Sequence, residues 1–301
     1  MIAEVPEKMF KDCGTQTITQ KSQVPQDMLV ENFSIEDLKY YTGFDTKRFK
    51  LLFCAIDVKY SPFDKYIDTK NQLAMCLMKY RRAIDFFFIA KLYKFPRKVV
   101  SNIFSYWTRL IYLYLNKIDF WSLRYKQNSK YTAIIDCSEI YTERSSINPK
   151  INQETFSNYK NHNTFKYLIA IDEKGLVIFC SAVYGGSKSD RFIVENSNFI
   201  ELLSAGDILL ADRGFNISDL LETKGVALNI PPFKSAPQFE INEIMETRII
   251  ANRRIHVERV INLSKKNRLI AETIPSNLKH LINEIVFNLN FLCNFKGSVV
   301  E

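Results

Sequence analysis

The sequence predicts a mixed α/β domain that follows a basic, all-helical region. The character of the sequence changes at residue 131, from which short apolar runs rich in strand-forming residues follow one another. Helical patterns alternate with these runs and follow them, whereas helical periodicity alone marks the residues before 130. The chain of 301 residues is long enough for one large domain or two modest ones. We therefore expect a helical region over 34–130 and the α/β domain over 131–301.

The first third of the chain carries signals for a tail and then for helices. Residues 1–33 are polar and lack a sustained period, which predicts a flexible tail. Ser34 followed three residues later by Asp37 is the pattern of a helix N-cap, and a second helix is expected near 49–56. A clearer helix begins at Thr69, so helices should fill the region up to 130.

Positive charge is concentrated in this helical region. Residues 79–130 contain 12 Lys and Arg residues and two Asp residues, whereas the whole chain has a net charge of +8. The remainder is therefore slightly acidic. A basic region of this kind indicates a polyanionic partner, either nucleic acid or an anionic membrane surface.

Within the basic region, residues 85–107 have the pattern of a helix–turn–helix. Ala90 lies inside the first expected helix, Phe95 lies in the turn, and a second helix should begin near Pro96. The polar residues of that second helix form the face expected to reach phosphates and base edges in a DNA major groove: Arg97, Lys98, Ser101, Asn102 and Ser105. The alternative is a helical region that only braces the α/β domain.

The α/β domain should begin with the apolar run at 131–137. A hairpin of two strands follows, joined by a Glu173-Lys174-Gly175 turn. The remaining elements, in chain order, are a helix at about 191–203, a buried strand at 207–212, a short helix near 217–222, a buried strand at 226–230, and helices at about 242–264 and 276–295.

Two aspartates stand at the polar ends of apolar strand patterns, namely Asp136 and Asp212. In open α/β sheets the carboxyl edge of the strands is where ligand sites form. Two carboxylates that converge there repel one another unless a cation lies between them. Hard oxygen ligands of this kind suit Mg²⁺ or Mn²⁺ rather than zinc.

A third carboxylate, Glu258, lies on the long helix expected near the C-terminal end of the domain. The apolar residues Ile250, Val257, Val260 and Ile261 mark the helix face that should pack on the sheet, and Glu258 lies at its edge. From spacing alone two interpretations stay open. Glu258 points to the sheet edge as a ligand, or it is a surface residue paired with Arg254.

The chain resembles a known family in six strings of residues: IIDCSEIYTERS, SNYKNHNTFKYLIAI, VYGGSKSD, LLADRGF, LNIPPF and RRIHVERVI. In this order they resemble the DDE superfamily endonucleases, the Harbinger-like transposases and their insertion-sequence relatives, over roughly residues 68–295. The resemblance implies an RNase H-like fold and a double-stranded DNA substrate. It also implies that Asp136, Asp212 and Glu258 bind two divalent metals, Mg²⁺ or Mn²⁺, about 3.5–4 Å apart for phosphodiester cleavage and strand joining.

Further polar residues lie beside the matched strings, each with an alternative structural role. Asp190 either caps the next helix or lies near the site. Glu139 and Glu143 follow Asp136 with unknown orientation. The basic residues are either phosphate ligands or solvated surface groups: Lys160, His162, Arg213 and Arg259.

Two departures from the family pattern concern DNA recognition. The turn of the helix–turn–helix carries Lys94 where a glycine is usual, and the first 60 residues contain only Cys13 and Cys54 and no histidine, so a zinc module is not expected. Recognition of DNA ends is then impaired, or it depends on a homo-oligomer or an accessory DNA-binding protein. Two functions remain open: an active transposase, or a domesticated descendant that binds DNA without cutting it.

Other classes of protein are disfavoured. No apolar run reaches the length of a membrane span, and the first residues lack the pattern of a signal peptide. The six cysteines are scattered without metal-ligand spacing, as in a reducing compartment. We expect a protein that is not secreted, nuclear in a eukaryote and otherwise cytoplasmic.

Overall fold

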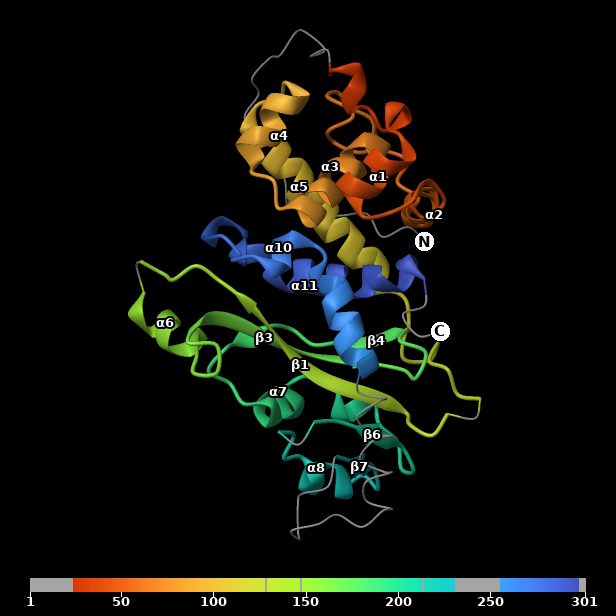
Figure 1. Ribbon diagram of the computed structural model, residues 1–301, viewed down its shortest axis with the longest axis vertical. Coiled ribbons are helices and arrows are strands. Elements are labelled where there is room, and N and C mark those ends of the chain that lie inside the picture. Colours follow the sequence, from red (N-terminus) through yellow and green to blue (C-terminus); the bar gives the residue numbers. More distant parts are fainter. Residues whose placement is uncertain (1–23, 128, 147, 213, 231–254, 298–301) are drawn as a thin grey trace.

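The computed structural model describes residues 24–127, 129–146, 148–212, 214–230 and 255–297. In Figure 1 the N-terminal helices lie at the top, and α10 and α11 lie beneath them. Strands β1, β3 and β4 of the mixed sheet cross the molecule below these helices, and β6 and β7 lie at the bottom together with α7 and α8. This arrangement confirms the predicted fold class, a mixed sheet flanked by helices after an N-terminal helical region.

The helical region contains five α-helices and two short 3-10 helices within the described residues. Their bounds are η2 Gln26–Met28, η3 Val30–Asn32, α1 Ile35–Thr42, α2 Thr46–Ile56, α3 Thr69–Arg82, α4 Phe86–Tyr93 and α5 Arg97–Leu115. The Ser34 side chain accepts a hydrogen bond from the Asp37 backbone in the expected capping box. Asp68 caps α3, which begins at Thr69 as predicted.

Part of the segment that the sequence assigns to a tail is packed. Residues 1–23 lie outside the described residues, but the two 3-10 helices at 26–32 bury Met28 and Val30. The Val30 backbone nitrogen donates a 2.8 Å hydrogen bond to the Asn71 side chain, which is itself buried in α3. Tertiary contacts that a polar, aperiodic sequence does not reveal therefore hold this stretch in place.

The sheet has the order β2-β3-β1-β6-β7, with β4 and β5 also pairing with β3. The strands are β1 Ala133–Tyr141, β2 Phe156–Ser157, β3 His162–Ile171, β4 Val177–Cys180, β5 Tyr184–Gly185, β6 Ile208–Leu210 and β7 Ala227–Asn229. Strand β1 is antiparallel to β3 but parallel to β6, and β6 is parallel to β7. The predicted hairpin joins β3 to β4, with Gly175 at a φ of 81° in its turn.

The helices of the α/β part cover both faces of this sheet. They are α6 Pro149–Thr155, α7 Asp190–Asn196, η4 Ile200–Leu202, α8 Ser218–Glu222, a helix at 255–265, α10 Arg268–Ala271, η5 Ser276–Leu281, α11 Ile282–Phe291 and η6 Leu292–Lys296. The part of the long predicted helix before residue 255 lies outside the described residues.

Two apolar clusters form the core, one on each side of the sheet. The larger joins one sheet face to the helical region and includes Ile134, Trp107 and Leu289. The smaller lies on the opposite face, where Ile135 packs with Ile193 of α7. Alternate residues of β1 thus enter different cores, as strand geometry requires.

The strand predicted at 226–230 is less buried than expected. Ala227 is exposed, and Leu228 and Asn229 are half-buried. Strand β7 pairs with β6 at one end of the described sheet, so one side of its backbone has no described strand beside it.

Candidate active site

Asp136 lies inside strand β1 rather than at its end, which corrects the prediction. The strand continues to Tyr141 and pairs with β3 along this length, from Ile134 opposite Ile171 to Tyr141 opposite Thr164. The apolar run stops at Asp136, but the antiparallel partner supplies hydrogen bonds to the polar residues beyond it. Apolar patterning therefore underestimates the length of β1.

The register of β1 and β6 makes Asp136 and Asp212 neighbours. Ile134 is paired with Leu210 in parallel, and each aspartate follows its member of that pair by two residues. Adjacent strands lie about 4.8 Å apart, and residues two apart face the same side. Both Ile134 and Leu210 belong to the larger core cluster, so the two aspartates lie on the sheet face shared with the helix at 255–265.

Glu258 reaches this face from the helix at 255–265. Val257 and Val260 are fully buried in the larger core cluster and Ile261 is 8% exposed, which confirms the predicted packing face. Glu258 is exposed beside that stripe. In Figure 1 this helix is the light blue one that descends from the layer of α10 and α11 toward β1. Ile250 and Arg254 lie outside the described residues.

An open cleft of about 680 Å³ contains all three carboxylates. It lies where β1 runs on past the end of β6, so its walls come from both sides of the sheet. Its described lining consists of Asp136, Cys137, Ser138, Glu139, Tyr159, Lys160, Lys166, Asp190, Asp212, Glu258, Ile261, Asn262 and Lys265. The three carboxylates share this cleft, but within the described residues no group of three or more His, Cys, Asp or Glu side chains is arranged to hold a metal ion.

Asp190 enters the cleft from the first turn of α7, paired with a lysine. Its carboxylate lies 2.6 Å from Lys166 Nζ, with exposed side-chain fractions of 25% and 15%. The helix cap is Ser189, which accepts a hydrogen bond from the Phe192 backbone, so Asp190 does not have the capping role. Burial lowers the pKa of Lys166, but the hydrogen bond and charge of Asp190 outweigh it, and the pKa is raised overall.

Cys137 and Glu139 lie on the same side of β1 as this ion pair. Burial raises the pKa of the Cys137 thiol well above its usual range, and the charge of Asp190 raises it further. Glu139 accepts a 2.7 Å hydrogen bond from the Thr164 hydroxyl. The cleft thus has Asp136 on one face of β1 and a half-buried lysine–aspartate pair on the other.

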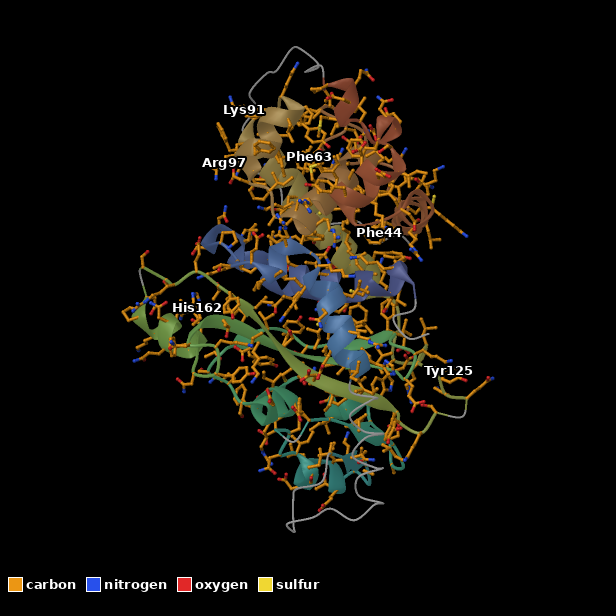
Figure 2. All side chains as sticks on the ribbon, in the orientation of Figure 1. Phe44, Phe63, Lys91, Arg97, Tyr125 and His162 are labelled. Atoms are coloured by element: carbon orange, nitrogen blue, oxygen red, sulfur yellow. The ribbon has the colours of Figure 1, made fainter. Side chains whose placement is uncertain are left out.

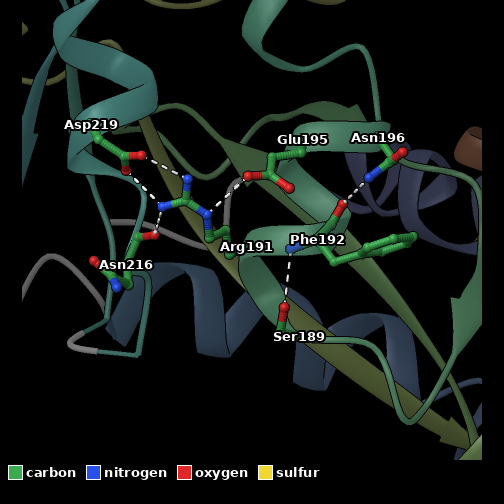
Figure 3. A network of polar contacts seen from close by, with 7 residues as sticks. All are labelled: Ser189, Arg191, Phe192, Glu195, Asn196, Asn216 and Asp219. Atoms are coloured by element: carbon green, nitrogen blue, oxygen red, sulfur yellow. Dashed lines mark hydrogen bonds and ion pairs between the residues drawn. The ribbon is translucent and has the colours of Figure 1, made fainter.

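An arginine that the sequence does not single out anchors α7 to the segment after Asp212. Arg191 donates two hydrogen bonds to Asp219, at 2.6 and 2.7 Å, and a third to the Asn216 carbonyl (Figure 3). Gly214, in the same segment, lies against Asp190, since a Cβ there would stand 3.7 Å from the Asp190 carboxylate. These contacts position Asp190 relative to the chain that follows Asp212.

Two lysines enter the cleft near the carboxylates. Lys265 is half-buried, and burial lowers its pKa; the charge of Lys160 lowers it further, whereas Glu139 and Asp136 raise it. The spacing of seven residues from Glu258 is two helical turns, which places Lys265 on the same helix face. That spacing is the signal by which the sequence could have indicated Lys265.

Other predicted residues lie elsewhere. His162 is exposed and contacts Tyr141 edge-on at 5.3 Å, outside the cleft lining, and Arg259 is also exposed outside it. Glu143 accepts a hydrogen bond from the Ser276 backbone and so faces η5. Arg213 lies outside the described residues.

The predicted DNA-contacting face lies at the start of α5. Pro96 is the N-cap and Arg97 the first helical residue. Arg97 and Lys98 are exposed, whereas Ser101 and Asn102 are half-buried. As expected, the inward residues of this pair of helices are buried, among them Ala90, Phe95, Val100 and Ile103. Lys94 ends α4 in the left-handed conformation with a φ of 54°, which explains why glycine is usual in such a turn.

Comparison with known families decides the identity of this fold. A family described as DDE superfamily endonuclease matches residues 135–294, just over half of the chain. The chain belongs to the DDE superfamily endonucleases. The match begins in β1 and ends in η6, so it contains every carboxylate of the cleft. Comparison with curated proteins and with solved structures gives no significant match to either.

Membership of this family confirms the resemblance seen in the sequence and implies a DNA substrate. Nucleases of the family generally use divalent metals. Among the helices that the structure describes, none is long and apolar enough to cross a membrane.

Proposed function

We propose that this DDE endonuclease is a metal-dependent transposase-type enzyme with Asp136, Asp212 and Glu258 as its catalytic carboxylates. The observation that supports it most is their convergence into one cleft: Asp136 from β1, Asp212 from two residues after the end of β6, and Glu258 from the helix at 255–265. Sheet and helix are held together by a buried apolar core, so Asp136 and Glu258 are presented from rigid elements, and Asp212 follows the buried strand β6 by two residues.

The donor set of the cleft fits Mg²⁺ or Mn²⁺. The three carboxylates offer hard oxygen ligands, which these ions prefer over nitrogen or sulfur. Two such ions would activate a water or a DNA 3′-hydroxyl and stabilise the oxygen that leaves phosphorus. Asp136, Asp212 and Glu258 would hold such ions at the sheet edge, and without cations these carboxylates repel DNA phosphates.

Lysines in the cleft offset this repulsion. Lys160 and Lys265 line the same cleft as the carboxylates and provide point charges for the scissile phosphate and its neighbour. Lys166 stays paired with Asp190 at 2.6 Å, so its role is to position the wall of the cleft.

DNA outside the cleft would be held by the start of α5. In Figure 2, Lys91 and Arg97 lie on the same side of the molecule as His162 at the end of the sheet. A duplex along this side would reach Arg97 and Lys98 while one strand enters the cleft, with Arg259 and His162 as further phosphate contacts.

The test is cleavage of supercoiled plasmid DNA in Mg²⁺ or Mn²⁺. The wild type should nick or cut the plasmid, and Asp136→Asn, Asp212→Asn and Glu258→Gln should each reduce the rate on the order of 10³-fold, because each removes one oxygen ligand. Glu201→Gln, an exposed carboxylate in η4 outside the cleft, is the matched control and should cut like the wild type. A wild type that neither cuts nor binds divalent metal contradicts the proposal, and one that binds DNA without cutting supports a domesticated binding protein.

A further inference from the structure

One aromatic side chain at the cleft is exposed to an unusual degree. Tyr159 is 83% exposed, more than any other large apolar or aromatic side chain among the described residues. It lies in the turn at 158–161 that connects β2 to β3. Single exposed aromatics are common on protein surfaces, so exposure alone assigns no role.

The position of Tyr159 distinguishes it from the other exposed aromatics. It lines the same cleft as Asp136, Asp212 and Glu258. The Lys160 ammonium lies 4.5 Å from the centre of the Tyr159 ring. A nucleotide can contact both of these groups, because its base stacks on an aromatic ring and its phosphate pairs with a cation.

The turn that presents Tyr159 is short and anchored. Phe156 pairs with Asn163 and Ser157 with His162 on either side of it. The buried Ser157 hydroxyl accepts a hydrogen bond from the Lys160 backbone, and Asn161 adopts a positive φ of 49°. A ring on such a support loses little conformational freedom when a ligand stacks on it.

More aromatic surface lies beside this turn. Tyr141, at the end of β1, is 38% exposed and contacts His162 edge-on, and Phe156 is also 38% exposed. Phe156 and His162 belong to the two strands that the turn at 158–161 joins, and Tyr141 ends β1, which pairs with β3. The end of the sheet at the cleft therefore combines exposed rings with a lysine, a composition typical of surfaces that bind unpaired nucleotides.

We propose that Tyr159 stacks on an unpaired base next to the scissile phosphate, while Lys160 pairs with an adjoining phosphate. The base must be unpaired because a base inside a duplex is stacked between its neighbours and offers only its edges. The inference rests on the proposed function for its DNA substrate. It adds that the enzyme prefers DNA that is frayed, mismatched or distorted at the cutting position.

The experiment compares binding of the full chain to two DNA probes in Ca²⁺, with gels to verify that the DNA stays intact. One probe is a fully paired duplex, and the other is the same duplex with a short mismatched bubble that contains 2-aminopurine. The wild type should bind the bubble roughly 5- to 150-fold more tightly than the duplex, the range of one stacked base. It should also quench the 2-aminopurine fluorescence.

Substitutions separate stacking from other roles of the residue. Tyr159→Phe should retain the preference and the quenching, because it retains the ring. Tyr159→Ala should lose both and leave duplex affinity within about twofold, because phosphate contacts dominate duplex binding. Tyr60→Ala is the matched control, since Tyr60 is 74% exposed in the helical region and outside the cleft lining.

If the protein binds DNA, three results would overturn the inference. They are equal affinity of the wild type for both probes, a Tyr159→Ala variant that quenches like the wild type, and a Tyr159→Ala variant that changes only the molecular mass in solution, which indicates a protein interface. Absence of any DNA binding overturns it as well. Cutting in Mg²⁺ is scored separately, so quenching without cutting contradicts the proposed function alone, and cutting without a bubble preference contradicts this inference alone.

Discussion

The cleft and the start of α5 are both charged surfaces, but they are built in different ways. The cleft places carboxylates on a sheet and a packed helix, and its lysines are close to acidic neighbours. At the start of α5, Arg97 and Lys98 are exposed at the first turn of the helix, with buried apolar residues behind them. The difference fits the proposed division of work, in which the cleft would cut DNA and α5 would hold it.

One buried apolar cluster lies beneath both the cleft and the start of α5. The larger apolar cluster extends from Trp107 in α5 through Leu289 in α11 to Ile134 in β1. Asn288 of α11 donates a 2.7 Å hydrogen bond to the Thr108 carbonyl of α5, at a site that is fully buried. If α5 binds DNA as proposed, this shared core fixes the distance from that DNA to the cleft.

The largest expected effect separates cutting from holding. Asp136→Asn should lower the cleavage rate on the order of 10³-fold while the Kd for duplex DNA stays within about twofold, because it removes a metal ligand and leaves the basic surface intact. Cleavage rates and fluorescence anisotropy on the same preparations measure both. A large loss of DNA affinity in this variant would contradict the division.

A smaller effect is expected at the wall of the cleft. Asp190→Asn removes the charge that pairs with Lys166 and should slow cleavage about 10- to 100-fold, the usual cost of losing a positioning partner. A double variant with Lys166→Met should lose little more than either single variant, since the residues act as a pair. If the losses of cleavage rate in the two single variants add up in the double variant, Asp190 and Lys166 do not act as a pair.

The basic surface should respond to salt. Replacing both Arg97 and Lys98 by Ala should weaken duplex binding by roughly tenfold at low salt and reduce the slope of log K against log salt by about 2, because each phosphate contact releases counterions. Titrations at several salt concentrations measure this slope. Lys47→Ala, an exposed lysine in α2, is the control, and an unchanged slope in the double variant would rule out DNA contact by α5.

Lys79 contributes to the positive charge of residues 79–130, but its burial keeps it from contacting DNA. It is 6% exposed, donates to the Ala83 carbonyl and lies 4.9 Å from the Phe86 ring centre. Burial lowers its pKa to about 8, against opposing effects of Asp85 and Glu272. Lys79→Met should therefore leave DNA affinity unchanged.

Stability should depend on pH through this lysine. The unfolded chain binds its proton up to the ordinary pKa of 10.5 and the folded chain only up to about 8, so the free energy of unfolding rises as pH increases between these values. Denaturant titrations at pH 7 and pH 10 should show this rise, on the order of 1 kcal/mol, in the wild type relative to Lys79→Met. The same pH dependence in both proteins would contradict it.

Apolar patterning predicted the mixed α/β sheet with its flanking helices, and it indicated that Asp136 and Asp212 lie near one edge of that sheet. Two strand patterns that become polar at an aspartate indicate a shared sheet edge, and the register of Ile134 with Leu210 supports that expectation. The buried stripe of Val257 and Val260 likewise gave the orientation of the helix that carries Glu258. Metal binding by these residues remains a prediction.

What the sequence could not predict depends on pairing between distant residues. Strand β1 extends beyond Asp136 because its polar second half pairs with β3. Nothing in the sequence of β1 indicates that partner. The ion pair of Lys166 with Asp190 and the contact of Arg191 with Asp219 likewise join separate elements. In a chain with 41 basic and 33 acidic residues, charge alone does not select such partners.

The most direct test of the central claim is titration of the protein with Mn²⁺ in a calorimeter, without DNA. Binding of divalent ions should be present in the wild type and in Glu201→Gln, and it should weaken at least about tenfold in Asp136→Asn, Asp212→Asn and Glu258→Gln, because each carboxylate is a ligand in this account. Equal Mn²⁺ affinity in the wild type and in all three cleft variants would contradict the assignment of the metal site to these residues.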